Sequence, residues 1–346
     1  MTSSTRRAPR TIGAAAAVLV GLGATALTAA PAQAAPGFAF DQRISGPDRD
    51  ATAVAASRLL FPTDGTGADV VVVNGAATVD GLTASYLAGL VSAPVLYTST
   101  AAVPAGTAAE ITRLGAENVW IVGGTSQVPA AQERAWTDAG LTVERLAGAD
   151  RYATAAAVAL ADTEGPPEQV FVANGERLAD ALAVGPVAWQ RNFPILLTRA
   201  GDVPQVTAQA LDELGSGDRV VVGGTAAVSD ATYTALGADQ RLAGADRQET
   251  AARVADDAIA TENFDPQSVA LVGGADAMAA DALVAAPLAG SRGVPVLFTG
   301  GDGTLGASTT AYLTARKADL TGTGWIFGGP AAVPQATADA ATAAVQ

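Results

Sequence analysis

Short runs of almost continuously apolar residues recur along the chain. The first three are VVVVNG (70–75), PVLYT (94–98) and VWIVGG (119–124). β-Branched and aromatic residues dominate them, and such unbroken apolar strands are typical of a parallel sheet that is covered on both faces. Alanine-rich stretches of helical length separate the runs. The pattern therefore predicts an α/β fold of alternating strands and helices with parallel sheets.

The same order of runs occurs three times. The second set is VFVANG (170–175), PILLT (194–198) and VVVGG (220–224), and the third is VALVGG (269–274), PVLFT (295–299) and WIFGG (325–329). A motif of the form R-x-x-G-x-D-R-x-x-T, starting at Arg43, Arg145 and Arg241, precedes each set. Self-similarity at a fixed period indicates a repeat protein. We predict three repeats, at 43–144, 145–240 and 241–346, which follow an N-terminal segment at 35–42.

Each repeat is long enough to form a small α/β layer unit with a core of its own. Asp48, Asp150 and Asp246 stand where the first helix of each repeat is expected to begin, and an aspartate there caps the helix N-terminus. Equal units with equal surfaces favour equal contacts, so we expect the three to pack with pseudo-threefold symmetry.

The first 34 residues have the pattern of a secretory signal peptide. Three arginines precede a small, apolar stretch at 11–30, and Ala32-Gln33-Ala34 forms a cleavage site, so residues 1–34 are predicted to be removed. An uncleaved membrane anchor is the alternative, but the stretch is weakly hydrophobic for a stable span. No later segment is apolar enough to span a membrane, and we expect the mature protein to be secreted.

The amino-acid composition excludes several classes of function. The 346 residues include no Cys and no His, which excludes a thiol nucleophile, a Ser-His-Asp triad and a His- or Cys-bound metal. The net charge of −14 argues against binding to nucleic acid. A glycosidase that uses only carboxylates remains possible on this ground, as does a binding protein. We expect no enzyme activity, no metal and no cofactor.

Residues that recur in all three copies either build the unit or serve a site that is used three times. Arg49, Arg151 and Arg247 follow the capping aspartates, and arginine suits bidentate contact with carboxylate or phosphate. An internal ion pair, either to the adjacent unit or to an aspartate, explains them equally well. The arginines that head each motif are expected to tie the units together.

A second recurrent set follows the first strand of each unit. Asp80, Asp180 and Asp281 open the next helix, where each is either a first-turn acid or a polar group facing a crevice. Paired glycines after the third strand permit tight turns at the carboxyl edge of a sheet, where open α/β folds bind ligands.

The combined motifs resemble the cell wall-binding repeat 2 family over residues 43–346. The resemblance implies three Rossmann-like repeats that anchor a secreted protein non-covalently to the Gram-positive wall through anionic secondary polymers. It places a Pro-Ile-Leu-Leu motif of polymer binding at 194–197, and the middle copy is the closest to the family pattern. The predicted polymer-binding residues are Arg49, Arg151, Arg247, Pro194, Ile195, Leu196, Leu197, Thr198, Asp180 and Asn174.

We therefore expect a secreted, non-catalytic protein of the cell wall, whose partner is a wall polysaccharide or a teichoic-acid-like polymer. A carboxylate-based wall hydrolase is one alternative. A surface or adhesion protein that self-assembles through its repeats is the other. The sequence names no protein partner.

Overall fold

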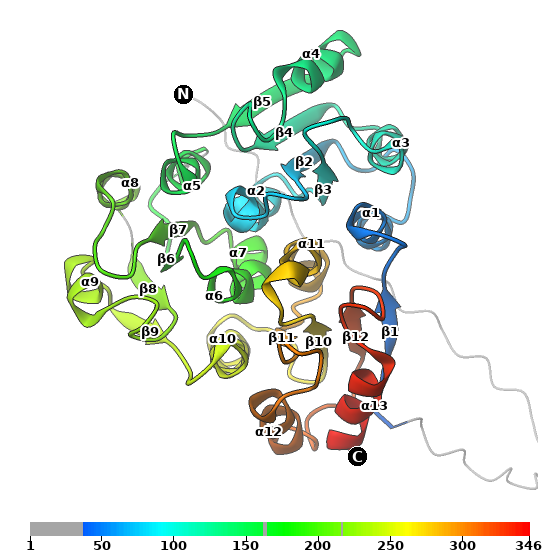
Figure 1. Ribbon diagram of the computed structural model, residues 1–346, viewed down its shortest axis with the longest axis vertical. Coiled ribbons are helices and arrows are strands. Elements are labelled where there is room, and N and C mark those ends of the chain that lie inside the picture. Colours follow the sequence, from blue (N-terminus) through cyan, green and yellow to red (C-terminus); the bar gives the residue numbers. More distant parts are fainter. Residues whose placement is uncertain (1–36, 162–164, 216) are drawn as a thin grey trace, which may run out of the picture. The chain divides into compact units, whose positions relative to one another are not determined.

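Three parallel sheets of four strands each organise the described part of the chain (Figure 1). The computed structural model describes residues 37–161, 165–215 and 217–346, so the predicted signal peptide lies outside the described residues. Residues 37–346 form one compact unit. The predicted α/β class with parallel sheets is confirmed.

The sheets repeat one strand order. The first sheet runs β3-β2-β4-β5, with β2 (Asp69–Asn74), β3 (Val95–Thr98), β4 (Asn118–Val122) and β5 (Thr142–Leu146). The second runs β7-β6-β8-β9, with β6 (Gln169–Asn174), β7 (Ile195–Thr198), β8 (Asp218–Val222) and β9 (Gln240–Leu242). The third runs β1-β12-β10-β11, with β1 (Phe40–Ile44), β10 (Val269–Val272), β11 (Val296–Phe298) and β12 (Gly324–Phe327).

Helices connect the strands in each unit. Unit one has α1 (Arg49–Leu60), the 3₁₀ turn η1 (Asp80–Thr83), α2 (Ala84–Leu90), α3 (Ala105–Leu114) and α4 (Ala130–Asp138). Unit two has α5 (Arg151–Ala159), α6 (Leu178–Ala183), α7 (Gly185–Arg191), α8 (Gln205–Leu214) and α9 (Asp230–Ala235). Unit three has α10 (Arg247–Thr261), the 3₁₀ turn η2 (Asp276–Met278), α11 (Ala279–Ser291), α12 (Ala307–Ala315) and α13 (Gln335–Ala344).

The apolar runs form the sheet cores, as their pattern predicts. Val70 to Val73 of β2 have no exposed surface, and Ile195 and Leu196 of β7 are equally buried. Helices on both faces of each sheet explain why these strands are apolar at successive positions.

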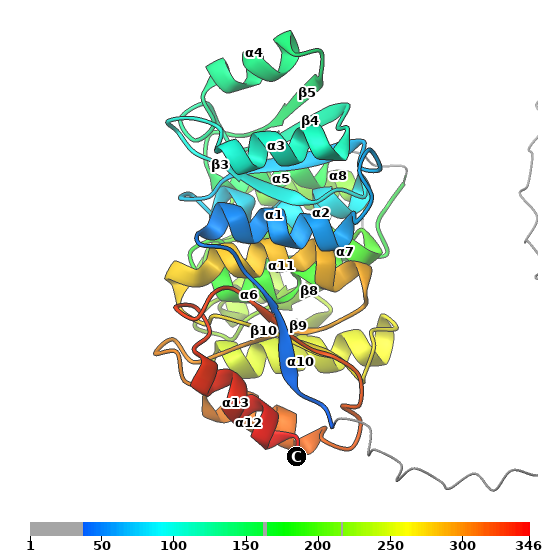
Figure 2. The same ribbon diagram turned by 90° about the vertical axis from the view of Figure 1, so that its right-hand side faces the viewer.

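The fourth strand of each sheet comes from the start of the next sequence repeat. β5 contains Arg145 and pairs with β4, while β9 contains Arg241 and pairs with β8. The ring closes because β1, which contains Arg43, pairs with β12 of the third sheet. In Figure 2 the blue strand β1 lies beside the red helix α13, from the opposite end of the described residues. Each sheet therefore joins two consecutive repeats, taken cyclically.

Three equivalent helices meet at the centre. Figure 1 shows α2, α7 and α11 side by side, with the sheets arranged around them in the expected pseudo-threefold manner. Glycines let them approach closely, since a Cβ on Gly89 of α2 would lie 2.2 Å from the main-chain oxygen of Trp189 in α7. A Cβ on Gly290 of α11 would lie 2.6 Å from the oxygen of Pro186. The core of the assembly thus depends on contact between helix backbones.

Candidate functional site at the seams between units

The recurrent motif folds into a turn that starts the first helix of each unit. In unit two, the Asp150 carboxylate accepts a hydrogen bond from the Ala153 amide at 2.9 Å, which caps α5. The Thr154 hydroxyl accepts one from the Gly148 amide at 3.1 Å. Asp48 and Asp246 cap α1 and α10 in the same way, as the sequence predicted. The motif therefore starts a helix, and it sets the position of the arginine that follows the capping aspartate.

Each capping aspartate is followed by an arginine that reaches the carboxyl end of its own unit's first parallel strand. Nη1 of Arg151 donates to the main-chain oxygen of Gly175 at 2.7 Å, directly after β6. Nη1 of Arg247 donates to Gly274 at 2.6 Å, and Arg49 donates in the same manner to Gly75. One N–H of each guanidinium is thus committed to the backbone, and the planar fork is held at the edge of the sheet.

The three recurrent aspartates lie against the paired-glycine turn of their own unit. Asp180 is in the first turn of α6 and has only 9% of its surface exposed. Gly223 has φ of +113°, and a Cβ there would lie 2.6 Å from the Asp180 carboxylate. Gly328 stands in the same relation to Asp281. Glycine is therefore required at this turn both for its backbone conformation and for room beside the carboxylate.

The electrostatics link each aspartate to the arginine of the next unit. Burial raises the pKa of Asp80, and the Arg151 guanidinium opposes that shift. Burial likewise raises the pKa of Asp180 to about 6 against the opposing charges of Arg177 and Arg247. The third such pair, Asp281 and Arg49, joins unit three to unit one.

In that arrangement, burial raises the pKa of Asp281, and Arg49 of unit one opposes the rise. Three Arg–Asp arrangements therefore lie at the three seams. All three recurrent aspartates are first-turn acids, with Asp180 and Asp281 buried and Asp80 half-buried, and each interacts electrostatically with an arginine of the next unit.

The arginines differ in their other partners. Arg247 forms an ion pair with Asp276 at 2.6 Å. Among the described residues, Arg49 and Arg151 take part in no ion pair. Their remaining N–H groups are therefore the more available ones for an anionic ligand.

A groove of about 560 Å³ follows the seam between units two and three. Asp180 and Arg177 line it from unit two, and Arg247, Asp246 and Asp276 line it from unit three. The paired-glycine turn at 224–227 forms another wall. Sequence reasoning did not find Arg177 or Asp276. The longer spacing from Gly274 to Asp281 than from Gly175 to Asp180 was the available signal for the second.

The remaining predicted residues lie beneath this edge. Asn174 is 1% exposed, and its amide donates to the oxygen of Ala227 at 2.5 Å and accepts from the Glu176 amide at 2.7 Å. Thr198 is fully buried and donates to the oxygen of Asp202 at 3.2 Å. Asn174 therefore holds together the two loops that form the seam, whereas the Thr198 hydroxyl binds within its own loop.

The Pro-Ile-Leu-Leu segment, 194–197, lies in the core of the second sheet. All four residues are buried, and Ile195, Leu196 and Leu197 are at most 1% exposed. Side chains without exposed surface cannot contact a polymer directly. The structure therefore separates this segment from the arginines and Asp180, which do reach a seam.

In residues 37–161, 165–215 and 217–346, no three acidic side chains gather as a metal site would require. No helix within these ranges has the length and apolar character needed to cross a bilayer.

Known proteins share this arrangement. The chain is similar to the solved structure of Cwp8 from Clostridium difficile, with a TM-score of 0.77, 27% identity, and coverage of 88% of this chain and 51% of that one. Cwp6 from the same organism gives a TM-score of 0.73, again at 27% identity, and the match covers 88% of this chain and 48% of Cwp6.

Two proteins of Bacillus subtilis are similar to this chain in sequence. N-acetylmuramoyl-L-alanine amidase LytC of Bacillus subtilis is 34% identical over 213 residues, which are 62% of this chain and 42% of LytC. The amidase enhancer of Bacillus subtilis is 27% identical over 263 residues, 75% of this chain and 35% of that protein. The chain thus spans less than half the length of each. The model of cell wall binding domain 2 matches three segments, 43–133, 145–233 and 241–338. These three matches follow the three repeats, and the chain belongs to the cell wall binding domain 2 family.

Proposed function

We propose that this chain is a secreted, non-catalytic protein that binds the bacterial cell wall non-covalently, through anionic secondary polymers held at the seams between its units. The observation that carries this proposal is the set of three arginines at equivalent seams. Arg49, Arg151 and Arg247 each have one N–H bound to a glycine oxygen and present the rest of the fork at a carboxyl sheet edge. A fixed guanidinium binds phosphate or carboxylate with two parallel hydrogen bonds.

The overall charge of −14 opposes the approach of an anionic polymer from a distance. Two features weaken this repulsion locally. Screening at physiological salt limits the repulsion to about 8–10 Å. In addition, burial raises the pKa of the seam aspartates, so Asp180, at about 6, is partly protonated in mildly acidic surroundings. A polymer phosphate at the seam then meets a fixed arginine and a carboxyl group of reduced charge.

Within this proposal, the buried Pro194–Leu197 segment builds the sheet edge and Asn174 fixes the loops above it. The protonation state of Asp180 sets the negative charge beside Arg247. The predicted signal peptide and the surface location implied by the family support a place outside the cytoplasm. The amidase activity in the name of LytC belongs to that protein, of which this chain covers 42%.

The test is retention of the purified mature chain by native walls and by walls stripped of secondary polymers. Binding to native walls that is lost on stripping supports the proposal. Equal retention by both preparations would indicate that the ligand is peptidoglycan. Clearing of a peptidoglycan suspension, or release of new sugar ends, would instead favour the carboxylate hydrolase. A mass that rises with protein concentration would favour the self-assembling surface protein.

A further inference from the structure

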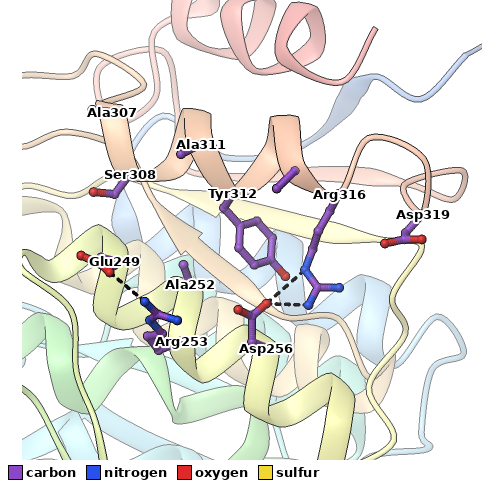
Figure 3. Close-up of a pocket in the computed structure, with 11 residues that line it drawn as sticks. Glu249, Ala252, Arg253, Asp256, Ala307, Ser308, Ala311, Tyr312, Arg316 and Asp319 are labelled. Atoms are coloured by element: carbon purple, nitrogen blue, oxygen red, sulfur yellow. Dashed lines mark hydrogen bonds and ion pairs between the residues drawn. The ribbon is translucent and has the colours of Figure 1, made fainter.

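A second groove lies in unit three, between α10 and α12. Its volume is about 780 Å³, and Figure 3 shows its lining. Ala307, Ala311 and Ala315 lie along α12 at helical spacing, and Ala252 of α10 is part of the floor. Polar side chains complete the lining: Glu249, Arg253, Asp256, Ser308, Tyr312, Arg316 and Asp319. None of the seam arginines or aspartates lines this groove.

Two ion pairs occupy the groove. Nε and Nη2 of Arg316 both donate to Oδ1 of Asp256, at 3.0 and 2.6 Å, and the same guanidinium lies 5.2 Å from the centre of the Tyr312 ring. Arg253 and Glu249 form the other pair at 3.1 Å. Figure 3 shows these pairs facing the space between the helices. Both arginines are thus neutralised within the groove, and each keeps further N–H groups.

Unit two provides an internal comparison, because its helices α5 and α8 are the counterparts of α10 and α12. Thr207 and Thr309 mark equivalent positions. The hydroxyl of each donates to the main-chain oxygen of the fourth residue of the preceding PILLT or PVLFT run. Counting from these threonines, and from the motif arginines Arg151 and Arg247, five of these polar positions have an apolar counterpart. The pairs are Glu249 and Ala153, Arg253 and Ala157, Asp256 and Leu160, Ser308 and Val206, and Arg316 and Leu214.

Leu214 of unit two belongs to its hydrophobic core, and Leu160 and Val206 are partly buried against that core. The same pair of helices therefore folds well with an apolar contact. Partly buried ion pairs lose hydration and are often no more stable than the apolar residues they replace. The equivalent helices of unit one, α1 and α3, also hold an ion-pair network, but its central Glu110 is fully buried, whereas the five polar residues of unit three line an open groove. Unit three also has eight residues between Arg316 and Trp325, against five between Leu214 and Val220, and this longer segment supplies Asp319 to the groove wall.

The chemistry of the lining indicates an uncharged ligand rich in hydroxyl groups. Glu249, Asp256 and Asp319 disfavour an anion, while Arg253 and Arg316 disfavour a cation. Alanines form the floor of the groove, and hydrogen-bond donors and acceptors surround it. A ring whose one face is less polar can therefore lie against the alanines. Pockets of roughly 300–1,000 Å³ hold small ligands by a few fixed polar groups on an apolar surface.

We propose that the groove between α10 and α12 is a binding site for a neutral oligosaccharide, separate from the anionic-polymer site at the seams. Hydroxyl groups of a sugar ring can donate to Asp256 and Asp319 and accept from Arg253 and Arg316. This site does not rest on the proposed function of the seams.

A glycan array with neutral and phosphorylated oligosaccharides, probed with the mature chain, tests this proposal. We expect binding to at least one neutral oligosaccharide, and calorimetry with that compound gives the affinity. Ala311→Trp, at an exposed position of the floor, should fill the groove and weaken binding at least tenfold. Its matched control is Gln209→Trp, the equivalent exposed position in α8, which should leave binding unchanged.

The double variant Asp256→Leu, Arg316→Leu installs the residues of unit two. It should abolish sugar binding and keep a cooperative melting transition. If this variant does not fold, Ala311→Trp decides alone. The proposal is overturned if no neutral oligosaccharide binds, if only phosphorylated ones bind, or if Ala311→Trp binds like the wild type. Retention on polymer-bearing walls reports the seam site independently, and it should be unaffected by Ala311→Trp.

Discussion

Nη1 of Arg43 donates a hydrogen bond to the main-chain oxygen of Gly328 at 2.9 Å, although 285 residues separate the two. Arg145 and Arg241 make the equivalent bond to Gly123 and Gly223 in the other sheets. This bond, with the pairing of β1 and β12, closes the ring of three units. The expectation that these arginines tie the units together is therefore confirmed.

The three ties should differ in strength. Arg145 also binds Glu133 and the oxygen of Val128, whereas Nη2 of Arg43 is buried without a partner among the described residues, and burial lowers the pKa of Arg43. We expect Arg145→Ala to reduce the free energy of unfolding by roughly 2–3 kcal/mol and Arg43→Ala by about 1 kcal/mol. Urea unfolding measures both, and Gln42→Ala, at an exposed position of β1, is the control. The reverse order would contradict this account of the closure.

Arg151→Ala should weaken retention on polymer-bearing walls by roughly 1–3 kcal/mol, the value of a charge-assisted hydrogen bond. The physical reason is that Arg151 has no ion-pair partner among the described residues and keeps N–H groups free of the backbone. Raising salt should weaken the wild type more than the variant. Arg151→Lys, which keeps the charge without the fork, should recover only part of the binding.

Arg134→Ala is the matched control for Arg151→Ala, since it removes the same charge from an exposed position of α4. A purely structural Arg151 would show a lower melting temperature in proportion to its lost binding. Retention of Arg151→Ala at the level of Arg134→Ala would remove Arg151 from the site.

Asp180 should make stability depend on pH. Because burial raises its pKa to about 6 in the folded chain, the folded state binds more protons than the unfolded state between about pH 4 and 6. Stability contributed by this group therefore falls as pH rises through that window. Asp180→Asn should be more stable than the wild type at pH 7.5, by at most about 3 kcal/mol, and the gain should vanish near pH 4.

Melting curves across pH 4–8 check this, with the exposed Asp212→Asn as control. The same Asp180→Asn variant should bind anionic walls more tightly at pH 7.5, because a carboxylate beside Arg247 is lost. A gain that does not change with pH would show that Asp180 is not the titrating group.

The motif turn should tolerate no side chain at Gly148. A Cβ there would lie 2.3 Å from the Cβ of Ala153, and the Gly148 amide is bound by the Thr154 hydroxyl. Gly148→Ala should lower the free energy of unfolding by about 1–3 kcal/mol, the cost of an overpacked core. Thr154→Val should cost about 1–2 kcal/mol through the unpaired amide. Denaturant unfolding tests both, and Gly201→Ala, which has open space around its Cβ, should be neutral.

Local patterns were sufficient for much of the fold. The apolar runs predicted three strands in each unit, and the aspartates predicted the helix starts, because both signals depend on near neighbours in the chain. The fourth strand escaped prediction. β5 alternates exposed and half-buried positions, so it has no apolar run, and its pairing partner belongs to the preceding repeat.

The repeated sequence by itself determined the three-unit α/β architecture and the recurrent arginines and aspartates that lie at the seams, since a residue kept in three copies is visible without coordinates. Only the tertiary structure decided that the charge of Arg151 acts on Asp80 of unit one, and that the Pro194–Leu197 segment is buried beneath the edge. The reason is that strand exchange between neighbouring units brings each motif to the sheet of the repeat before it. Such contacts depend on how whole units pack, and no local spacing encodes them.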